Sequence, residues 1–178
     1  MSKEGELKVA DWGLARTFRV PDAEKTQEIV TLWYRAPEIL MGENRYTVGV
    51  DMWSVGCILA EFVTKRPVFV SDGTQIGQLF KIFQLTGTPA TEEWPEIVNL
   101  RDYKTTFPRF KASDFLHSEQ FVKAIGHEGI DLIEGLLQAN PAHRLNAMEA
   151  LQHPFFAGYV PRADQQSALF LQHQLNQP

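Results

Sequence analysis

A chain of 178 residues with 44% hydrophobic and 22% charged side chains has the composition of one globular domain, which excludes fibrous and intrinsically disordered proteins. The net charge of −5 gives no basic face for a phosphate backbone, so we expect no nucleic-acid partner. No apolar run approaches the roughly 20 residues of a membrane span, the start lacks a signal peptide, and Cys57 is the single cysteine. We therefore expect no membrane contact and a location in the cytoplasm, the nucleus or both.

The first third of the chain predicts one strand, a long loop and a short helix. Residues 6–10 (ELKVA) alternate between polar and apolar side chains, which predicts a short strand followed by a turn at 11–13. Residues 17–31 show no sustained period and are typical of a long surface loop. A short helix is predicted over 37–41, because its leading proline suits the first helical turn, and Gly42 can end it.

The middle of the chain predicts two helices and an irregular insert. Residues 50–63 are apolar on nearly all sides, which predicts a helix that is buried all round. Residues 74–85 carry apolar side chains at spacings of three and four, so we expect an amphipathic helix at the surface. Residues 87–113 contain three prolines and scattered aromatic side chains, which favours an ordered but irregular insert pinned by its aromatic rings.

The last part of the chain predicts two helices and a tail. Apolar residues between 130 and 137 form a helical stripe that stops near Pro141. Asn146 and Glu149 have the spacing of a helix cap and its reciprocal partner, which predicts a final helix. We expect one domain over residues 1–157, a loosely ordered tail over 158–178, and a mainly α-helical fold with one or two short N-terminal strands.

Three motifs in one order carry a family resemblance. They are residues 11–16 (DWGLAR), residues 33–38 (WYRAPE) and residues 51–56 (DMWSVG). Their order and spacing resemble the second half of a protein kinase, from the metal-binding motif through the activation segment to the buried central helix. Residues 29–40 (IVTLWYRAPEIL), together with the GTP and DYK sequences of the insert, resemble the cyclin-dependent kinases, and the resemblance runs from about Glu6 to Phe156.

The resemblance implies ATP and Mg²⁺ as the cofactors of the complete kinase. Asp11 would coordinate the Mg²⁺ that bridges the ATP phosphates, and Thr31 would hydrogen-bond the catalytic aspartate. Thr26 stands 15 residues after Asp11, where cyclin-dependent kinases carry the activating phosphothreonine, and Arg16 would help to hold the phosphate. The alternative for Thr26 is an ordinary surface threonine.

Three further residues resemble the pocket that selects the substrate residue after the target serine or threonine. They are Ile29, Val30 and Arg35. If the Arg35 side chain donates a hydrogen bond to the Val30 carbonyl oxygen, no acceptor remains for the N–H of that substrate residue. Proline has no N–H, so it is penalised least at this position. The resemblance thus implies protein substrates with Ser/Thr-Pro, although Ile29 and Val30 would serve equally well as plain packing residues.

Structural and partner-binding roles follow from the same resemblance. Glu38 and Arg144 would form the ion pair that ties the activation segment to the lower lobe, and Asp51 would be the buried carboxylate that anchors the catalytic loop. A docking surface for small Cks-type subunits would include Ile76, Asp102, Tyr103 and Lys104. Ordinary surface residues are an equally good interpretation of that set, and a cyclin would be the other partner of the complete kinase.

The chain does not contain every motif of a working kinase. The Gly-rich loop, the strand lysine and the His-Arg-Asp catalytic loop are missing, so we expect a fragment of the C-terminal lobe that transfers no phosphate alone. An apolar strip on the helix over 50–63 should stay uncovered and associate with another copy, a chaperone or a complementary fragment. The alternatives to a truncated kinase are a non-catalytic decoy or scaffold for cell-cycle partners, and a decayed gene.

Overall fold

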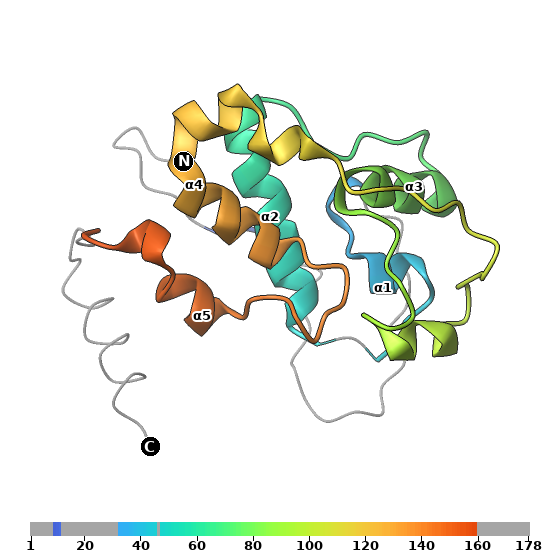
Figure 1. Ribbon diagram of the computed structural model, residues 1–178. Helices are drawn as coiled ribbons and strands as arrows, with labels where there is room; N and C mark the ends of the chain where they lie inside the picture. The colour runs from blue at the N-terminus through green and yellow to red at the C-terminus, as the bar shows by residue number, and fades with distance from the viewer. Residues whose placement is uncertain (1–8, 12–31, 46, 160–178) are drawn as a thin grey trace, which may run out of the picture.

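A computed structural model describes residues 9–11, 32–45 and 47–159 of the chain. Figure 1 shows these residues as a mainly helical body. Five α-helices are described: α1 (Pro37–Leu40), α2 (Gly49–Thr64), α3 (Gln75–Thr86), α4 (Glu119–Leu136) and α5 (Ala147–Leu151). Four short 3₁₀ helices accompany them: η2 (Leu32–Tyr34), η3 (Pro95–Asn99), η4 (Asp114–His117) and η5 (Pro154–Phe156).

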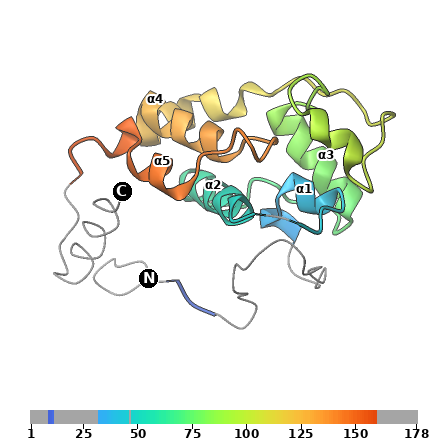
Figure 2. The same ribbon diagram turned by 90° about the horizontal axis from the view of Figure 1, so that it is seen from below.

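Helix α2 is the centre of this arrangement, and α4 packs beside it in both views (Figures 1 and 2). The two helices approach closely at Gly56, where an added Cβ atom would lie 2.9 Å from side-chain atoms of Leu136 and Leu137. Trp53 and Ala60, which lie on the same side of α2 as Gly56, are fully buried. A glycine at the crossing point therefore lets the two backbones come together without overpacking the core.

The opposite side of α2 is exposed, so the prediction of a helix buried all round is wrong. Val55, Ile58 and Phe62 form an apolar strip with exposed fractions of 41%, 42% and 51%. Figure 2 shows α4 and α5 on one side of α2 only. The expected uncovered apolar strip is present, because no helix in the described part of the chain packs on that side.

Helix α3 and the insert pack on one another and share one hydrophobic core with α2. Thr74 caps α3, because its hydroxyl oxygen accepts a hydrogen bond of 3.0 Å from the Gly77 N–H. Phe107 of the insert meets Phe80 of α3 edge to face, with 5.7 Å between the ring centroids, and Phe110 lies 6.1 Å from the same ring. The prediction of an irregular insert pinned by aromatic rings is confirmed.

The start of α4 differs from the sequence-based prediction, and the predicted N-terminal strand lies mostly outside the described residues. Residues 1–8 lie outside the described residues, and within the described part of the chain there is no strand, Val9 and Ala10 included. Helix α4 begins eleven residues before Ile130, and Gly126 interrupts it with φ +67°, ψ −176°. Glycine adopts a positive φ of this kind without strain. The resulting kink divides the apolar pattern of α4 into two short stripes, so the sequence predicted only the second part of the helix.

The predicted cap of the last helix is confirmed. The Asn146 side chain accepts hydrogen bonds from the N–H groups of Met148 and Glu149, and the Glu149 carboxylate accepts one of 2.8 Å from the Asn146 N–H. Helix α5 is only five residues long, so these bonds satisfy a large share of its N–H groups.

Removing this cap should destabilise the fold measurably. We expect Asn146→Ala to lower the free energy of unfolding by about 1 kcal/mol, because the first-turn N–H groups of α5 lose their acceptor. Urea denaturation measures the change. Asn99→Ala is the matched control, since that exposed asparagine makes no side-chain hydrogen bond within the described residues, and its effect should stay within about 0.5 kcal/mol. Equal effects of the two substitutions would contradict the role of the cap.

Candidate substrate-segment anchor

A buried ion pair joins the start of α1 to the segment before α5. The Arg144 guanidinium donates two parallel hydrogen bonds to the Glu38 carboxylate, of 2.8 Å to Oε1 and 2.9 Å to Oε2. The side chains are 0% and 4% exposed, respectively. Bidentate pairing in a buried site fixes both the distance and the orientation of the two groups. The ion pair expected from the resemblance is thus present.

Backbone carbonyls satisfy the rest of the guanidinium. Arg144 Nε donates to the Gln138 carbonyl oxygen at 3.0 Å, and Nη1 donates to the Gly49 carbonyl oxygen at 2.8 Å. Nη2 also approaches the Ala139 carbonyl oxygen at 3.4 Å. The guanidinium lies 5.2 Å from the ring centroid of Trp53, within the range of a cation–π contact. A buried charge is tolerated at such a site because every donor has a partner.

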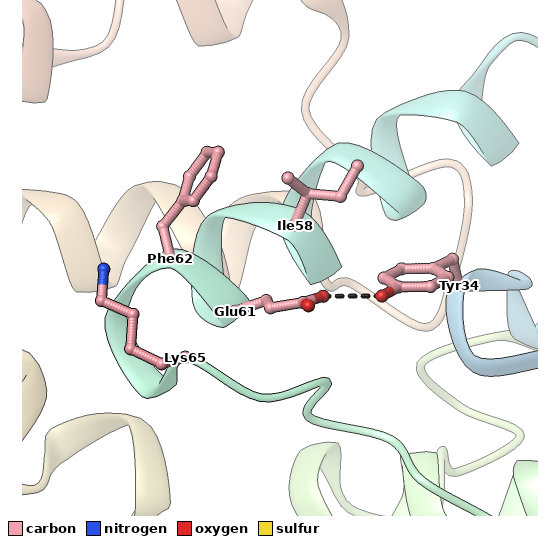
Figure 3. A pocket seen from close by; sticks show the side chains of 5 residues that line it. All are labelled: Tyr34, Ile58, Glu61, Phe62 and Lys65. Carbon is pink, nitrogen blue, oxygen red and sulfur yellow. Dashed lines mark hydrogen bonds between the residues drawn. The ribbon is translucent and has the colours of Figure 1, made fainter. Parts of the chain in front are cut away.

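A second, less buried interaction positions the residues just before α1. The Tyr34 hydroxyl donates a 2.7 Å hydrogen bond to the Glu61 carboxylate of α2, which Figure 3 shows beside Ile58 and Phe62. The Ser54 hydroxyl donates to the Tyr34 carbonyl oxygen at 2.9 Å. Sequence reasoning missed both contacts, and the only signal was the place of Tyr34 inside the WYRAPE motif.

The hydrogen bond to Glu61 changes the acidity of the phenol. This hydrogen bond, and to a smaller extent burial, raises the pKa of Tyr34 from 10.0 to about 12. Both the bond and the nearby negative charge of the carboxylate favour the protonated phenol. A pKa raised by folding stabilises the folded state fully below the unfolded value, and this contribution is lost as the pH rises from about 10 to about 12.

Arg35 and Asp11 are the described members of the predicted substrate and metal sites. Arg35 is partly buried between η2 and α1, and its N–H donates to the Leu32 carbonyl oxygen at 3.0 Å. Asp11 is exposed and has φ +63°. Among residues 9–11, 32–45 and 47–159, no group of three His, Cys, Asp or Glu side chains is arranged to hold a metal ion. The predicted role of Asp11 in holding Mg²⁺ stays a prediction.

Asp51 does not have the surroundings that the resemblance implies. It lies in the first turn of α2 and is exposed, whereas the resemblance implies a carboxylate buried against the catalytic loop of the complete kinase. Its side chain makes no hydrogen bond or ion pair within the described residues. The predicted role as an anchor of the catalytic loop needs a segment that the structure does not include.

The four residues of the predicted docking surface lie on α3 or in the insert. Ile76 is 47% exposed on α3. Tyr103 is partly buried and packs edge to face on Phe107, with 5.8 Å between the ring centroids. The Asp102 carboxylate is held by Arg101 at 2.8 Å, and this hydrogen-bonded pair keeps the pKa of Asp102 below its usual range. Lys104 is exposed.

The other predicted site residues lie outside the described residues. They are Arg16, Thr26, Ile29, Val30 and Thr31. Their roles in phosphate binding, activation and substrate selection stay predictions.

The comparison with known families identifies the class of protein. The protein kinase domain family matches residues 1–156, which is most of the chain. The chain therefore belongs to the protein kinase family. No helix in the described ranges is long and apolar enough to cross a membrane.

Breaking the buried ion pair should cost much more than breaking an exposed one. We expect Arg144→Met to lower the free energy of unfolding by about 3–5 kcal/mol, because Glu38 is left buried without a partner. Arg101→Met is the matched control: its pair with Asp102 is equally short, 2.8 Å, but 61% and 45% exposed, so the loss should stay below about 1 kcal/mol. Urea denaturation of both variants measures the difference, and comparable losses would contradict the importance of burial.

The acidity of Tyr34 gives a second prediction. Glu61→Gln should move the pKa of Tyr34 down from about 12 towards 10.0, because the neutral amide removes the carboxylate that favours the protonated phenol. Titration of ring-labelled tyrosine by NMR measures the pKa, and Glu93→Gln, at an exposed carboxylate of the insert, is the control. An unchanged Tyr34 pKa in Glu61→Gln would show that the hydrogen bond does not set it.

Proposed function

We propose that this chain forms the substrate-binding lower lobe of a serine/threonine kinase of the cyclin-dependent class. The complete kinase transfers the γ-phosphate of ATP to Ser or Thr followed by Pro, and this chain alone transfers none. The observation that carries the proposal is the buried Glu38–Arg144 pair, which fixes the end of the WYRAPE segment against the helical core. A segment that reads a substrate must keep its shape when a peptide binds, and this anchor provides that rigidity.

Selection of proline follows from the backbone hydrogen-bonding groups of the segment. In this proposal the Arg35 side chain donates a hydrogen bond to the Val30 carbonyl oxygen. The N–H of a substrate residue at this place then gives up its hydrogen bond to water and finds no acceptor in the kinase. An unsatisfied N–H costs about 1–3 kcal/mol, whereas proline has none to lose. Tyr34 supports this arrangement, because its hydroxyl and its carbonyl are both bonded to α2 next to Arg35.

Activation and partner binding complete the proposal. Phosphorylation of Thr26 would add a charge of about −2, which Arg16 helps to neutralise. A cyclin would bind the complete kinase, and a Cks-type subunit would bind the surface around Ile76 and residues 102–104. Asp11 would hold Mg²⁺ together with ATP only in the complete kinase, in the cytoplasm, the nucleus or both.

A non-catalytic scaffold is the second candidate function. Ile76 and Lys104 of the proposed docking surface are exposed, so a partner could reach this surface in the chain by itself. Binding at this surface would need no phosphate-transfer residue. A scaffold of this kind would compete with complete kinases for shared cell-cycle partners.

The first experiment determines the size and the activity of the natural protein. An antibody against residues 158–178 should detect a product well above 20.3 kDa in cells. The immunoprecipitate should phosphorylate a Ser-Pro peptide about 5- to 160-fold faster than the matched Ser-Ala peptide, because one unsatisfied N–H costs about 1–3 kcal/mol. The purified 178-residue chain should phosphorylate neither.

Two outcomes would overturn parts of this proposal. A sole product of 20.3 kDa without kinase activity would favour the scaffold. A large product that phosphorylates both peptides equally would retain the kinase function and remove the preference for proline.

A further inference from the structure

A polar hollow lies between the loop that follows α1 and the end of η3. Residues 42–45 and 99–101 line it, and its volume is about 600 Å³. The two walls are joined at the backbone, because the Asp102 N–H donates a 3.0 Å hydrogen bond to the Met41 carbonyl oxygen. None of the lining residues belongs to α2, so the hollow is separate from the exposed apolar strip of that helix.

A glycine makes room for the first of two arginine side chains in the hollow. Gly42 has φ +87°, and a Cβ atom added to it would lie 2.6 Å from Asp102 Oδ2 and 3.2 Å from Arg101 Nε. The Arg101–Asp102 pair therefore lies directly against the backbone of the loop. The Arg101 guanidinium donates to Asp102 through Nε and Nη2, at 3.2 Å and 2.8 Å. Its Nη1 group has no hydrogen-bond partner among the described residues, so one edge of the guanidinium is available for a ligand.

The second arginine comes from the opposite wall. The Arg45 side chain is exposed and makes no hydrogen bond or ion pair within the described ranges. The Glu43 carboxylate accepts a 2.6 Å hydrogen bond from the Arg45 backbone N–H, so it is engaged with the loop itself. Both carboxylates at the hollow, Glu43 and Asp102, thus have a donor. The unused hydrogen-bonding capacity in this part of the structure is on the side of the guanidinium donors.

These unused donors select the chemical class of the ligand. Guanidinium groups bind oxyanions through paired hydrogen bonds, and a phosphate has enough acceptor oxygens to engage two of them at once. The side-chain amides of Asn44 and Asn99 each offer a donor and an acceptor, which are the groups that a peptide backbone requires. A nucleotide is disfavoured, because the lining residues include no aromatic ring on which a base could stack.

We propose that this hollow binds a phosphorylated segment of a partner protein. The phosphate lies between Arg45 and Arg101, and the backbone that flanks it lies on Asn44 and Asn99. A volume of about 600 Å³ is in the range of sites that enclose a whole small molecule, so residues beside the phosphorylated one enter with it. The two nearby carboxylates offset much of the positive charge, so binding is weak and reversible. The site needs no phosphate transfer and therefore stands apart from the proposed function.

A peptide library tests the class of ligand. The 178-residue chain should bind a labelled degenerate peptide library with a fixed central phosphoserine at least about tenfold more tightly than the same library with serine. Fluorescence anisotropy measures both affinities. A library with glutamate at the fixed position should fall between the two, because a carboxylate has fewer acceptor oxygens. Inorganic phosphate should compete only at much higher concentrations than the unlabelled phosphoserine library, since it lacks the flanking backbone.

Substitution of the two arginines tests the position of the site. Arg45→Met and Arg101→Met should each weaken binding of the phosphoserine library by about tenfold or more, since each removes charge-assisted hydrogen bonds. Arg66→Met is the matched control: this exposed arginine follows the other end of α2, its side chain makes no hydrogen bond within the described residues, and its loss should leave binding unchanged. Arg101→Lys keeps the charge but loses the planar fork, so it should weaken binding by less than Arg101→Met does. Circular dichroism verifies that each variant is folded.

NMR locates the ligand without any substitution. On addition of the phosphopeptide that binds best, the side-chain amide signals of Asn44 and Asn99 should shift. The corresponding signals of Asn146, whose side chain caps α5, should stay in place.

Each of the other outcomes overturns the proposal. Equal binding of the phosphoserine and serine libraries, or binding of neither, would show that the chain does not recognise the phosphate. Competition by inorganic phosphate at the concentrations of the peptide itself would leave only a site for a free anion. Binding that is unaffected by both Arg45→Met and Arg101→Met would place the phosphopeptide on another surface.

Discussion

The buried guanidinium of Arg144 is the constraint on which the described structure depends. Its five N–H donors reach the Glu38 carboxylate, the Gly49 carbonyl at the start of α2, and the Gln138 and Ala139 carbonyls that follow α4. Removing such a group from water costs several kcal/mol unless its partners are all in place. The three segments must therefore adopt their positions together. As a result, the end of the WYRAPE segment is held in one position on the core.

Helix α2 connects the Arg144 site to the rest of the core through one of its two sides. On one side Trp53 lies under the guanidinium and stacks on Phe69, with 5.8 Å between the ring centroids, while Gly56 lets α4 approach. On the other side the apolar strip has no covering helix among the described residues.

Sequence patterns between near neighbours predicted the helices well. They could not predict contacts between residues that are far apart in the sequence. Asn146 and Glu149 identify their helix because a cap joins residues only three apart. Glu38 and Arg144 are 106 residues apart, so no periodicity links them, and their pairing came only from the family resemblance. The exposure of Asp51 could not be predicted either, because the burial of a side chain depends on which segments pack over it. The kink at Gly126 was missed because φ is not encoded in an apolar pattern.

The charges at the two ends of α2 have a local origin that explains why they are tolerated. An acidic residue in the first turn and a basic residue at the C-cap are favoured by the helix dipole, by about 0.3–1 kcal/mol each, so Asp51 and Lys65 need no partner to be tolerated. The helix itself therefore stabilises these charges, whatever packs over its two ends.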